Sequence, residues 1–170
     1  MEEQELLTSV ETKLRENFGP DLIVGTEMMR DFPVFTIKKD KIVDVIKFLY
    51  DDPEMEFRFL TDLCGIHFPD NKGQELGVIY HLHNMPKNWR IRLRIFFGIE
   101  DAVVPTLTTV FSAANWQERE TYDFYGIVFK GHPNMKRIMN VDDMVGFPLR
   151  KEFPLEDQNR EDKNDSMFGR

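Results

Sequence analysis

The chain has 170 residues, of which 41% are hydrophobic, and this predicts a single domain with enough apolar material for a core. Its 22 basic residues against 30 acidic ones give a net charge of −8, so the electrostatic drive for non-specific nucleic-acid binding is missing and nucleic acid is not an expected partner. The single cysteine, Cys64, excludes an internal disulfide and an iron–sulfur cluster held by this chain alone, since such a cluster generally needs about four thiolates.

No apolar run in the sequence approaches the roughly 20 residues that a membrane-spanning helix needs. The first residues, Met1 to Glu5, are acidic, whereas a signal peptide would begin with basic residues. We therefore expect a cytosolic chain whose association with any membrane depends on partners.

The first part of the chain predicts two helices separated by two short strands. Apolar residues at helical spacing predict an amphipathic helix over residues 2–18, which a Gly-Pro pair ends. Short strands are predicted over 22–26 and 32–38, the second with a proline that suits an edge or a strand start. Asp40 is expected to cap the second helix, which stops before an Asp-Asp-Pro sequence.

Three longer strands are predicted over residues 63–68, 76–83 and 89–97. His67 alternates with apolar neighbours in the first of them, so we interpret it as a histidine on a sheet face rather than as a ligand. These strands supply the middle of the expected sheet.

The last of these strands alternates apolar residues with Arg90, Arg92 and Arg94. Two explanations fit this arginine face. It is either a solvated face that discourages edge aggregation, or a face that pairs with acids from a neighbouring element or subunit.

The stretch from Asn115 to Leu155 combines aromatic, charged and proline residues without a Gly-rich phosphate loop or a Ser/His/Asp order, which suggests a docking surface. Asn115 is expected to cap a helix over residues 116–125, with Glu118 reaching back as in a capping box. Gly126 is expected to end that helix.

At about 100° per residue, Trp116, Arg119, Glu120 and Asp123 share one face of this helix, while Glu118 lies on the other. A charged helical face is usually solvated. A mixture of Trp and Arg, however, is typical of surfaces where proteins meet, so a docking face stays open as the second interpretation.

After this helix the pattern predicts a short strand over 127–129 and then an extended segment through Pro148 to Lys151, because proline and the residue before it both avoid helix. The tail beyond Leu155 is almost wholly polar. Alone it cannot bury enough surface to offset its ordering entropy, so it is expected to be disordered or ordered by a partner.

Several motifs occur together along the chain. They are Glu118-Arg119-Glu120, Asp123, Gly126, His132-Pro133, Arg137-Ile138 and Pro148-Leu149-Arg150-Lys151, preceded by Phe59-Leu60-Thr61-Asp62-Leu63, Tyr80-His81-Leu82, Arg90 to Arg94, Val103-Val104-Pro105 and Ala114-Asn115-Trp116. With these motifs the stretch from Phe57 to Leu155 resembles the 30 kDa subunit of respiratory complex I, the C subunit of bacterial NADH-quinone oxidoreductase. It departs from the usual family pattern at Tyr125, Val145 and Glu152.

The resemblance implies a non-catalytic structural subunit of the peripheral arm of proton-translocating NADH:quinone oxidoreductase, on the cytoplasmic side of the cell membrane. It implies partners of the 49 kDa type (the D subunit) and the iron–sulfur type (the B subunit) near the quinone site. FMN, the iron–sulfur centres and quinone are then expected on other subunits, with no cofactor on this chain. The residues expected at partner interfaces are Trp116, Glu118, Arg119, Glu120, Asp123, His132, Arg137, Pro148, Arg150 and Lys151.

The alternative of the same class is the equivalent subunit of a related membrane-bound hydrogenase or of a dehydrogenase with a donor other than NADH. An alternative of another class is a free-standing metal hydrolase, but its ligand sets are incomplete. The first set is Glu118, Glu120 and Asp123 with His132, in which two acids point to opposite sides of a helix. The second is His81 with His83, for which no third ligand stands at motif distance.

We therefore predict an α+β fold of two layers, in which a mainly antiparallel sheet carries the N-terminal helices on one face and the helix after Asn115 closes it. Residues 1–130 are expected to form this core domain. Residues 131–170 are expected to leave it as an extended C-terminal arm and polar tail that dock on partner subunits.

Overall fold

The computed structural model describes residues 3–30 and 32–154, which form a five-stranded sheet, a two-stranded sheet and three α-helices. The strand order in the large sheet is β1-β2-β5-β4-β3, with β2 and β5 parallel and every other pair antiparallel. The helices are α1 Glu3–Phe18, α2 Ile42–Asp51 and α3 Ala114–Tyr125; the strands are β1 Ile23–Met29, β2 Phe32–Ile37, β3 Phe59–His67, β4 Leu76–Asn84, β5 Trp89–Phe97, β6 Val103–Pro105 and β7 Val128–Lys130.

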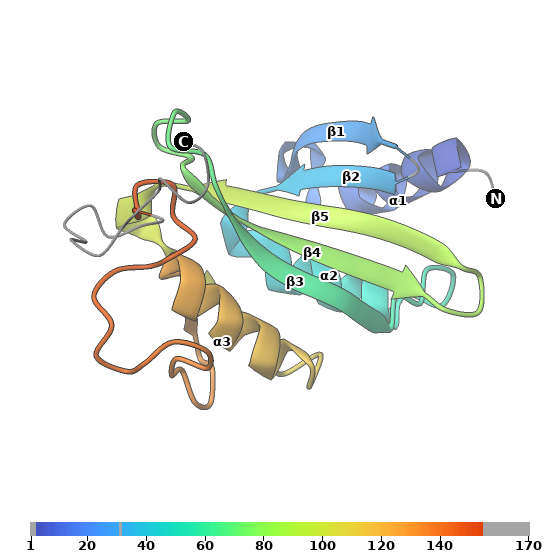
Figure 1. The fold of residues 1–170 in the computed structure, drawn as a ribbon. Coiled ribbons are helices and arrows are strands. Elements are labelled where there is room, and N and C mark those ends of the chain that lie inside the picture. The colour runs from blue at the N-terminus through green and yellow to red at the C-terminus, as the bar shows by residue number, and fades with distance from the viewer. Residues whose placement is uncertain (1–2, 31, 155–170) are drawn as a thin grey trace, which may run out of the picture.

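The α+β prediction is confirmed, and a single row of residues shows how the core forms. Phe35, Leu93, Tyr80 and Leu63 are cross-strand neighbours on β2, β5, β4 and β3, and all four are buried. The register therefore places them on one face of the sheet, because side chains alternate along each strand. Helices α1 and α2 cover this face with their apolar stripes (Figure 1).

The opposite face of the sheet carries the arginines of β5. The Arg94 guanidinium forms an ion pair with Glu27 on β1 at 2.7 Å and donates to the Thr36 hydroxyl at 2.7 Å. Arg92 lies 5.9 Å from the Phe32 ring centroid. For Arg94, the explanation that fits is pairing with an acid of another strand of the same sheet, across β2.

Both predicted helix caps are wrong. Asp40 lies within a short 3₁₀ turn, Lys39–Lys41, that leads directly into α2, so the cap position falls on Lys41 and no side chain caps the helix. Asn115 lies inside α3, which starts two residues earlier than predicted. Gly126 does end α3, with a φ of 73° in the left-handed region that glycine favours.

The arm does not leave the body over the part that the structure describes, which corrects the sequence-based expectation for residues 131–154. The segment contains turns and folds back along α3: the Leu149 N–H donates to the Phe124 carbonyl at 3.2 Å, and the Lys151 N–H donates to His67 Nδ1 at 3.0 Å. The predicted behaviour of the tail beyond Leu155 falls outside the described residues. Within residues 3–30 and 32–154, no helix has the length and apolar character to cross a membrane.

Candidate interface around the third helix

Glycines allow close packing on two sides of α3, against β3 and against the arm. A Cβ on Gly65 of β3 would lie 2.5 Å from the Tyr125 ring, so any larger residue would displace the helix. A Cβ on Gly126 would lie 2.4 Å from the Phe147 ring of the arm. Gly126 therefore serves both the turn that ends α3 and the close packing of the arm on that turn.

Asp123 is fully buried and fixes the arm to α3. Its Oδ2 accepts hydrogen bonds from three consecutive backbone N–H groups, those of Ile138, Met139 and Asn140, at 2.8–3.0 Å. Its Oδ1 accepts from Arg137 at 2.7 Å and from the Asn140 side chain at 3.0 Å. Burial acts to raise the pKa of the Asp123 carboxyl, but the hydrogen bonds from Asn140 and Arg137 outweigh it and hold the pKa well below its usual range.

Arg137, the basic partner of Asp123 in this ion pair, also hydrogen-bonds to the arm. Its guanidinium also donates to the Asp123 carbonyl at 2.9 Å and to the carbonyls of Met144 and Gly146, each at 3.0 Å. It lies 5.4 Å from the Phe147 ring centroid. One side chain thus ties α3 to three points of the arm.

Trp116 and Arg119 form the exposed part of α3. The Trp116 side chain is 61% exposed, and the Arg119 guanidinium lies 5.2 Å from its ring centroid. Arg119 also donates to the carbonyls of Lys136 and Arg137 at 3.1 and 3.0 Å. The arginine is therefore bound inward to the arm, while the indole is displayed outward.

Only part of the predicted charged face of α3 is therefore exposed to solvent. Trp116 and Glu120 are exposed and Arg119 is half-buried, but Asp123 is covered by the arm, so the inclusion of Asp123 in an exposed face is wrong. A helical projection shows which residues share a face and cannot show which other segment covers it.

Glu118 is fully buried on the opposite side of α3 and does not make the predicted capping box. Its carboxylate accepts from the Thr106 hydroxyl at 2.5 Å and from the Leu107 N–H at 2.6 Å, which ties α3 to the segment after β6. Burial raises the pKa of the Glu118 carboxyl to about 7, against the opposing effect of these two hydrogen bonds.

The remaining predicted interface residues lie on the arm or next to it. His132 donates from Nε2 to the Asn115 carbonyl at 3.0 Å and accepts the Asn134 N–H at Nδ1, so both ring nitrogens are engaged. Arg150 donates to the Tyr125 carbonyl at 2.8 Å and stacks 4.7 Å from the Phe147 ring centroid. Pro148 is half-buried and the Lys151 side chain is exposed.

Sequence reasoning missed the partners that hold α3 in place. The Thr106 hydroxyl, the Leu107 amide and the amides of residues 138–140 bond to acids 11 to 17 residues away. Every residue except proline has a backbone N–H donor, so no pattern in the sequence indicates which of these donors bond to the acids.

Neither candidate metal set is arranged to bind a metal. Within the part of the chain that the structure describes, no group of three or more His, Cys, Asp or Glu could hold an ion. His83 of the second set instead makes a 3.2 Å contact through Nε2 with the Asn88 side chain.

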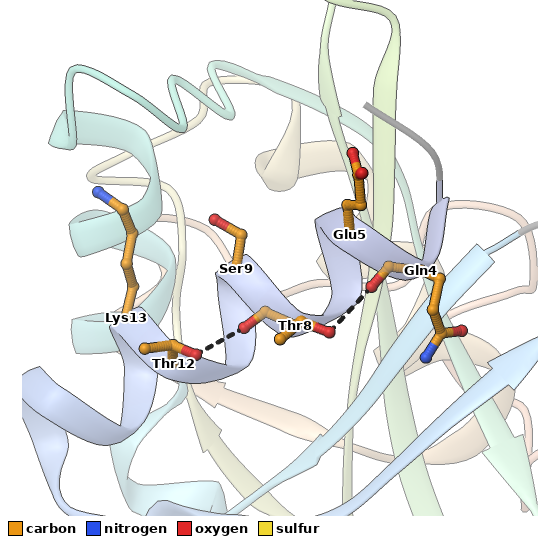
Figure 2. A pocket seen from close by; sticks show the side chains of 6 residues that line it. All are labelled: Gln4, Glu5, Thr8, Ser9, Thr12 and Lys13. Carbon is orange, nitrogen blue, oxygen red and sulfur yellow. Dashed lines mark hydrogen bonds between the residues drawn. The ribbon is translucent and has the colours of Figure 1, made fainter.

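The shallow hollow along α1 that Figure 2 draws is also unlike a ligand site. Its six lining residues all come from one helix, Gln4 to Lys13. The hydroxyls of Thr8 and Thr12 donate back to the carbonyls of Gln4 and Thr8 at 3.0 and 2.8 Å. Ligand sites gather polar groups that converge on the ligand, whereas these are used within the helix.

Fold and site together define an α+β domain in which helix α3 displays Trp116 and is braced by an arm that is anchored to it. The chain belongs to the family of the respiratory-chain NADH dehydrogenase 30 kDa subunit, which it matches over residues 35–159. It is thus a subunit, of the C type, of an NADH-quinone oxidoreductase complex, complex I.

Three relatives illustrate the match. The NADH-quinone oxidoreductase C subunit 2 of Rhizobium etli is 41% identical over 84% of this chain and 74% of that protein. The C subunit of the Citrifermentans bemidjiense enzyme is 41% identical over 88% of this chain and 90% of that protein. The C subunit of the Streptomyces coelicolor enzyme is 45% identical over 71% of this chain but only 48% of its own length, so the chain matches about half of that relative.

Two solved structures share the fold. The trypsin-resistant fragment (1–134) of Nqo5 is 26% identical with a TM-score of 0.63, over 79% of this chain and 99% of that chain. A chain of the membrane-bound sulfane sulfur reductase, an archaeal respiratory membrane complex, has a TM-score of 0.71 over 89% of this chain and 85% of that chain. Because the second is only 23% identical, it shows the fold alone.

Proposed function

We propose that this chain is a non-catalytic structural subunit of the peripheral arm of proton-translocating NADH:quinone oxidoreductase. In this role it holds the 49 kDa-type partner (the D subunit) and the iron–sulfur partner (the B subunit) in place near the quinone site, on the cytoplasmic side of the cell membrane. Electrons pass from NADH through FMN and iron–sulfur centres on other subunits to quinone. Family membership supports this role. Because electron transfer depends steeply on distance, a subunit that holds cluster-bearing neighbours in place would affect the rate without carrying an electron itself.

The observation that carries the proposal is the solvent exposure of Trp116 on α3. An indole that is 61% exposed on a helix surface offers a large apolar area for a partner to cover, and Trp and Arg are among the residue types most enriched in the hot spots of protein interfaces. Arg119 is held by two arm carbonyls, so little freedom is lost on binding.

The arm supplies a second set of exposed apolar side chains. Met139, Val141 and Val145 are all largely exposed, Val145 to 90%, although the backbone nearby is bonded to Asp123 and Arg137. A rigid backbone that presents apolar side chains to solvent is suited to docking. This supports docking of the arm, within residues 131–170, on partner subunits, beside the contact that Trp116 makes from the core domain of residues 1–130.

The alternative within the same class is the equivalent subunit of a membrane-bound hydrogenase or a dehydrogenase with another donor. The sulfane sulfur reductase chain shows that another respiratory complex contains this fold, but this likeness does not show to which complex the present chain belongs. The curated relatives are NADH-quinone oxidoreductase subunits, which favours NADH as the donor of the complex.

The experiment compares Trp116→Ala with Met85→Ala, a control at a hairpin tip with a side chain of similar exposure, 60%. Each tagged variant is co-expressed with the untagged wild-type chain, and their ratio is measured in the complex purified from membranes. We expect Trp116→Ala to be about 30-fold depleted, which corresponds to a hot-spot loss of about 2 kcal/mol.

The melting temperature of each free chain is the second readout. It should change little for either variant, because surface substitutions usually alter stability by at most about 0.5 kcal/mol. Normal incorporation of Trp116→Ala would contradict an interface at α3. Absence of the wild-type chain from the purified complex would contradict the proposed function itself.

A further inference from the structure

Strand β3 is an edge of the large sheet, since it pairs only with β4 (Figure 1). Among the described residues, no backbone hydrogen bond reaches its outer side between Leu60 and Ile66. At its end, the Lys151 N–H bonds to the His67 side chain, so the arm closes the edge there. An open strand edge is a template for a further strand, and natural proteins usually cover or blunt it.

A groove of about 230 Å³ runs between this edge and α3. It is smaller than the roughly 300–1,000 Å³ of typical small-molecule sites, so it does not suit a cofactor. A strand beside a helix is, however, the geometry in which extended peptides add to sheets. The groove is lined by Asp62, Cys64 and Gly65 of β3, Glu120 and Phe124 of α3, and Leu149 of the arm, among others.

The polar lining of the groove is acidic. Asp62 and Glu120 are both exposed, and neither forms an ion pair within the part of the chain that the structure describes. The Cys64 thiol, which also lines the groove, has a pKa raised to about 11 by burial and by the nearby Asp62 charge, against the opposing effect of Arg92. The groove thus disfavours a further negative charge and favours a positive one.

We propose that this groove binds an extended segment of a partner subunit, carrying Lys or Arg, that adds as a further strand to β3. The backbone of the segment pairs with the open edge between Leu60 and Ile66. Its basic side chains meet Asp62 and Glu120, and its apolar side chains meet Phe124 and Leu149. The inference rests on the proposed function, because the segment belongs to another member of the same complex, and it adds a contact separate from Trp116.

The first test is hydrogen–deuterium exchange of the wild-type chain, free and within the purified complex. The amides of β3 should exchange at least about tenfold more slowly in the complex, and the change should exceed that of β1, the other edge strand. Equal exchange of β3 in both states, or equal protection of both edges, overturns the proposal.

The second test reverses the charge of the groove. Asp62→Lys with Glu120→Lys is compared with Glu16→Lys with Asp21→Lys, which makes the same charge change at exposed acids of α1 and the turn after it. In competition with the wild-type chain for the complex, the groove variant should be depleted at least about tenfold, because like charges then face each other. The control variant should stay within about twofold, and both free chains should melt as the wild type does.

Equal incorporation of the two double variants overturns the groove proposal and leaves the proposed function standing. Failure of the wild-type chain to enter the complex overturns both. The proposal is supported if the groove variant is depleted from the complex while its free chain melts at the wild-type temperature, because the loss then lies in binding rather than in folding.

Discussion

Asp123→Asn tests whether one buried charge holds the arm on α3. The substitution keeps the size of the side chain but replaces an acceptor oxygen by an N–H₂ donor. Both carboxylate oxygens face only donors, three backbone amides on Oδ2 and Arg137 with Asn140 on Oδ1. In either orientation the new amide therefore opposes a donor.

The magnitude follows from the burial of this pair. Breaking a buried, hydrogen-bonded ion pair from one side costs about 3–5 kcal/mol. The chain can avoid that cost if residues 137–140 detach from α3, so the loss appears as local opening of the arm. At about 1.4 kcal/mol per decade, the open population should rise between about a hundredfold and a few thousandfold.

The assay is limited trypsin digestion of the free chain, with the bonds after Lys136 and Arg137 followed by mass spectrometry. Cleavage of a transiently open segment tracks its open population when reclosing is fast, so the rate should rise by the same factor. Asp143→Asn, at an exposed residue of the arm, is the control. If Asp123→Asn is cleaved no faster than this control, the charge does not hold the arm.

The same carboxylate predicts an acid sensitivity of the wild-type arm. The folded state lowers the pKa of Asp123 from its usual 3.8, so its stabilising contribution is present above that pH and is lost progressively as the pH falls below it. The wild-type arm should therefore become sensitive to pepsin, a protease that is active in acid, as the pH falls below 3.8, and mass spectrometry should place the new cleavage sites in the arm.

Three further predictions concern α3 and its turn. Gly126→Ala should lower the melting temperature more than Gly131→Ala, because both impose about 1–2 kcal/mol of left-handed strain but only the first also drives a methyl group into Phe147; equal losses would contradict this packing. Arg119→Ala should accelerate tryptic cleavage in the arm of the free chain, since it removes two hydrogen bonds to arm carbonyls, and an unchanged digestion pattern would place Arg119 solely at a partner. For Glu118, whose pKa rises from 4.5 to about 7 on folding, the wild-type unfolding free energy in urea should fall by up to about 3 kcal/mol as the pH rises from 4.5 to 7. Glu118→Gln should flatten this fall, and a slope that persists in the variant would contradict the assignment.

Elements with strong periodicity were predictable from sequence within a residue or two. The apolar stripe of α1 and the alternation along β5 each reflect one buried face, and burial decides their structure. The sheet order was not predictable, because β2 pairs in parallel with β5 across more than fifty intervening residues. Neither strand carries a signal for its partner beyond being apolar.

The candidate site was predictable in residue type but not in arrangement. Trp116 and Arg119 were expected to face outward with Asp123, and only the first does so fully. Periodicity places residues around a helix axis, whereas exposure depends on what packs there. The amides of residues 138–140 cover Asp123, and any residue type except proline supplies such a donor.

The two buried carboxylates of α3 fix the helix from opposite sides by different chemistry. Asp123 receives four N–H groups besides the Arg137 cation, enough to keep it ionised, and it binds the arm. Glu118 accepts hydrogen bonds from one hydroxyl and one N–H, which tie α3 to the segment after β6. The effect of burial on its pKa outweighs these two bonds and raises the pKa to about 7. A helix held on both sides loses little freedom when a partner covers Trp116, and more of the indole's burial energy is then available for affinity.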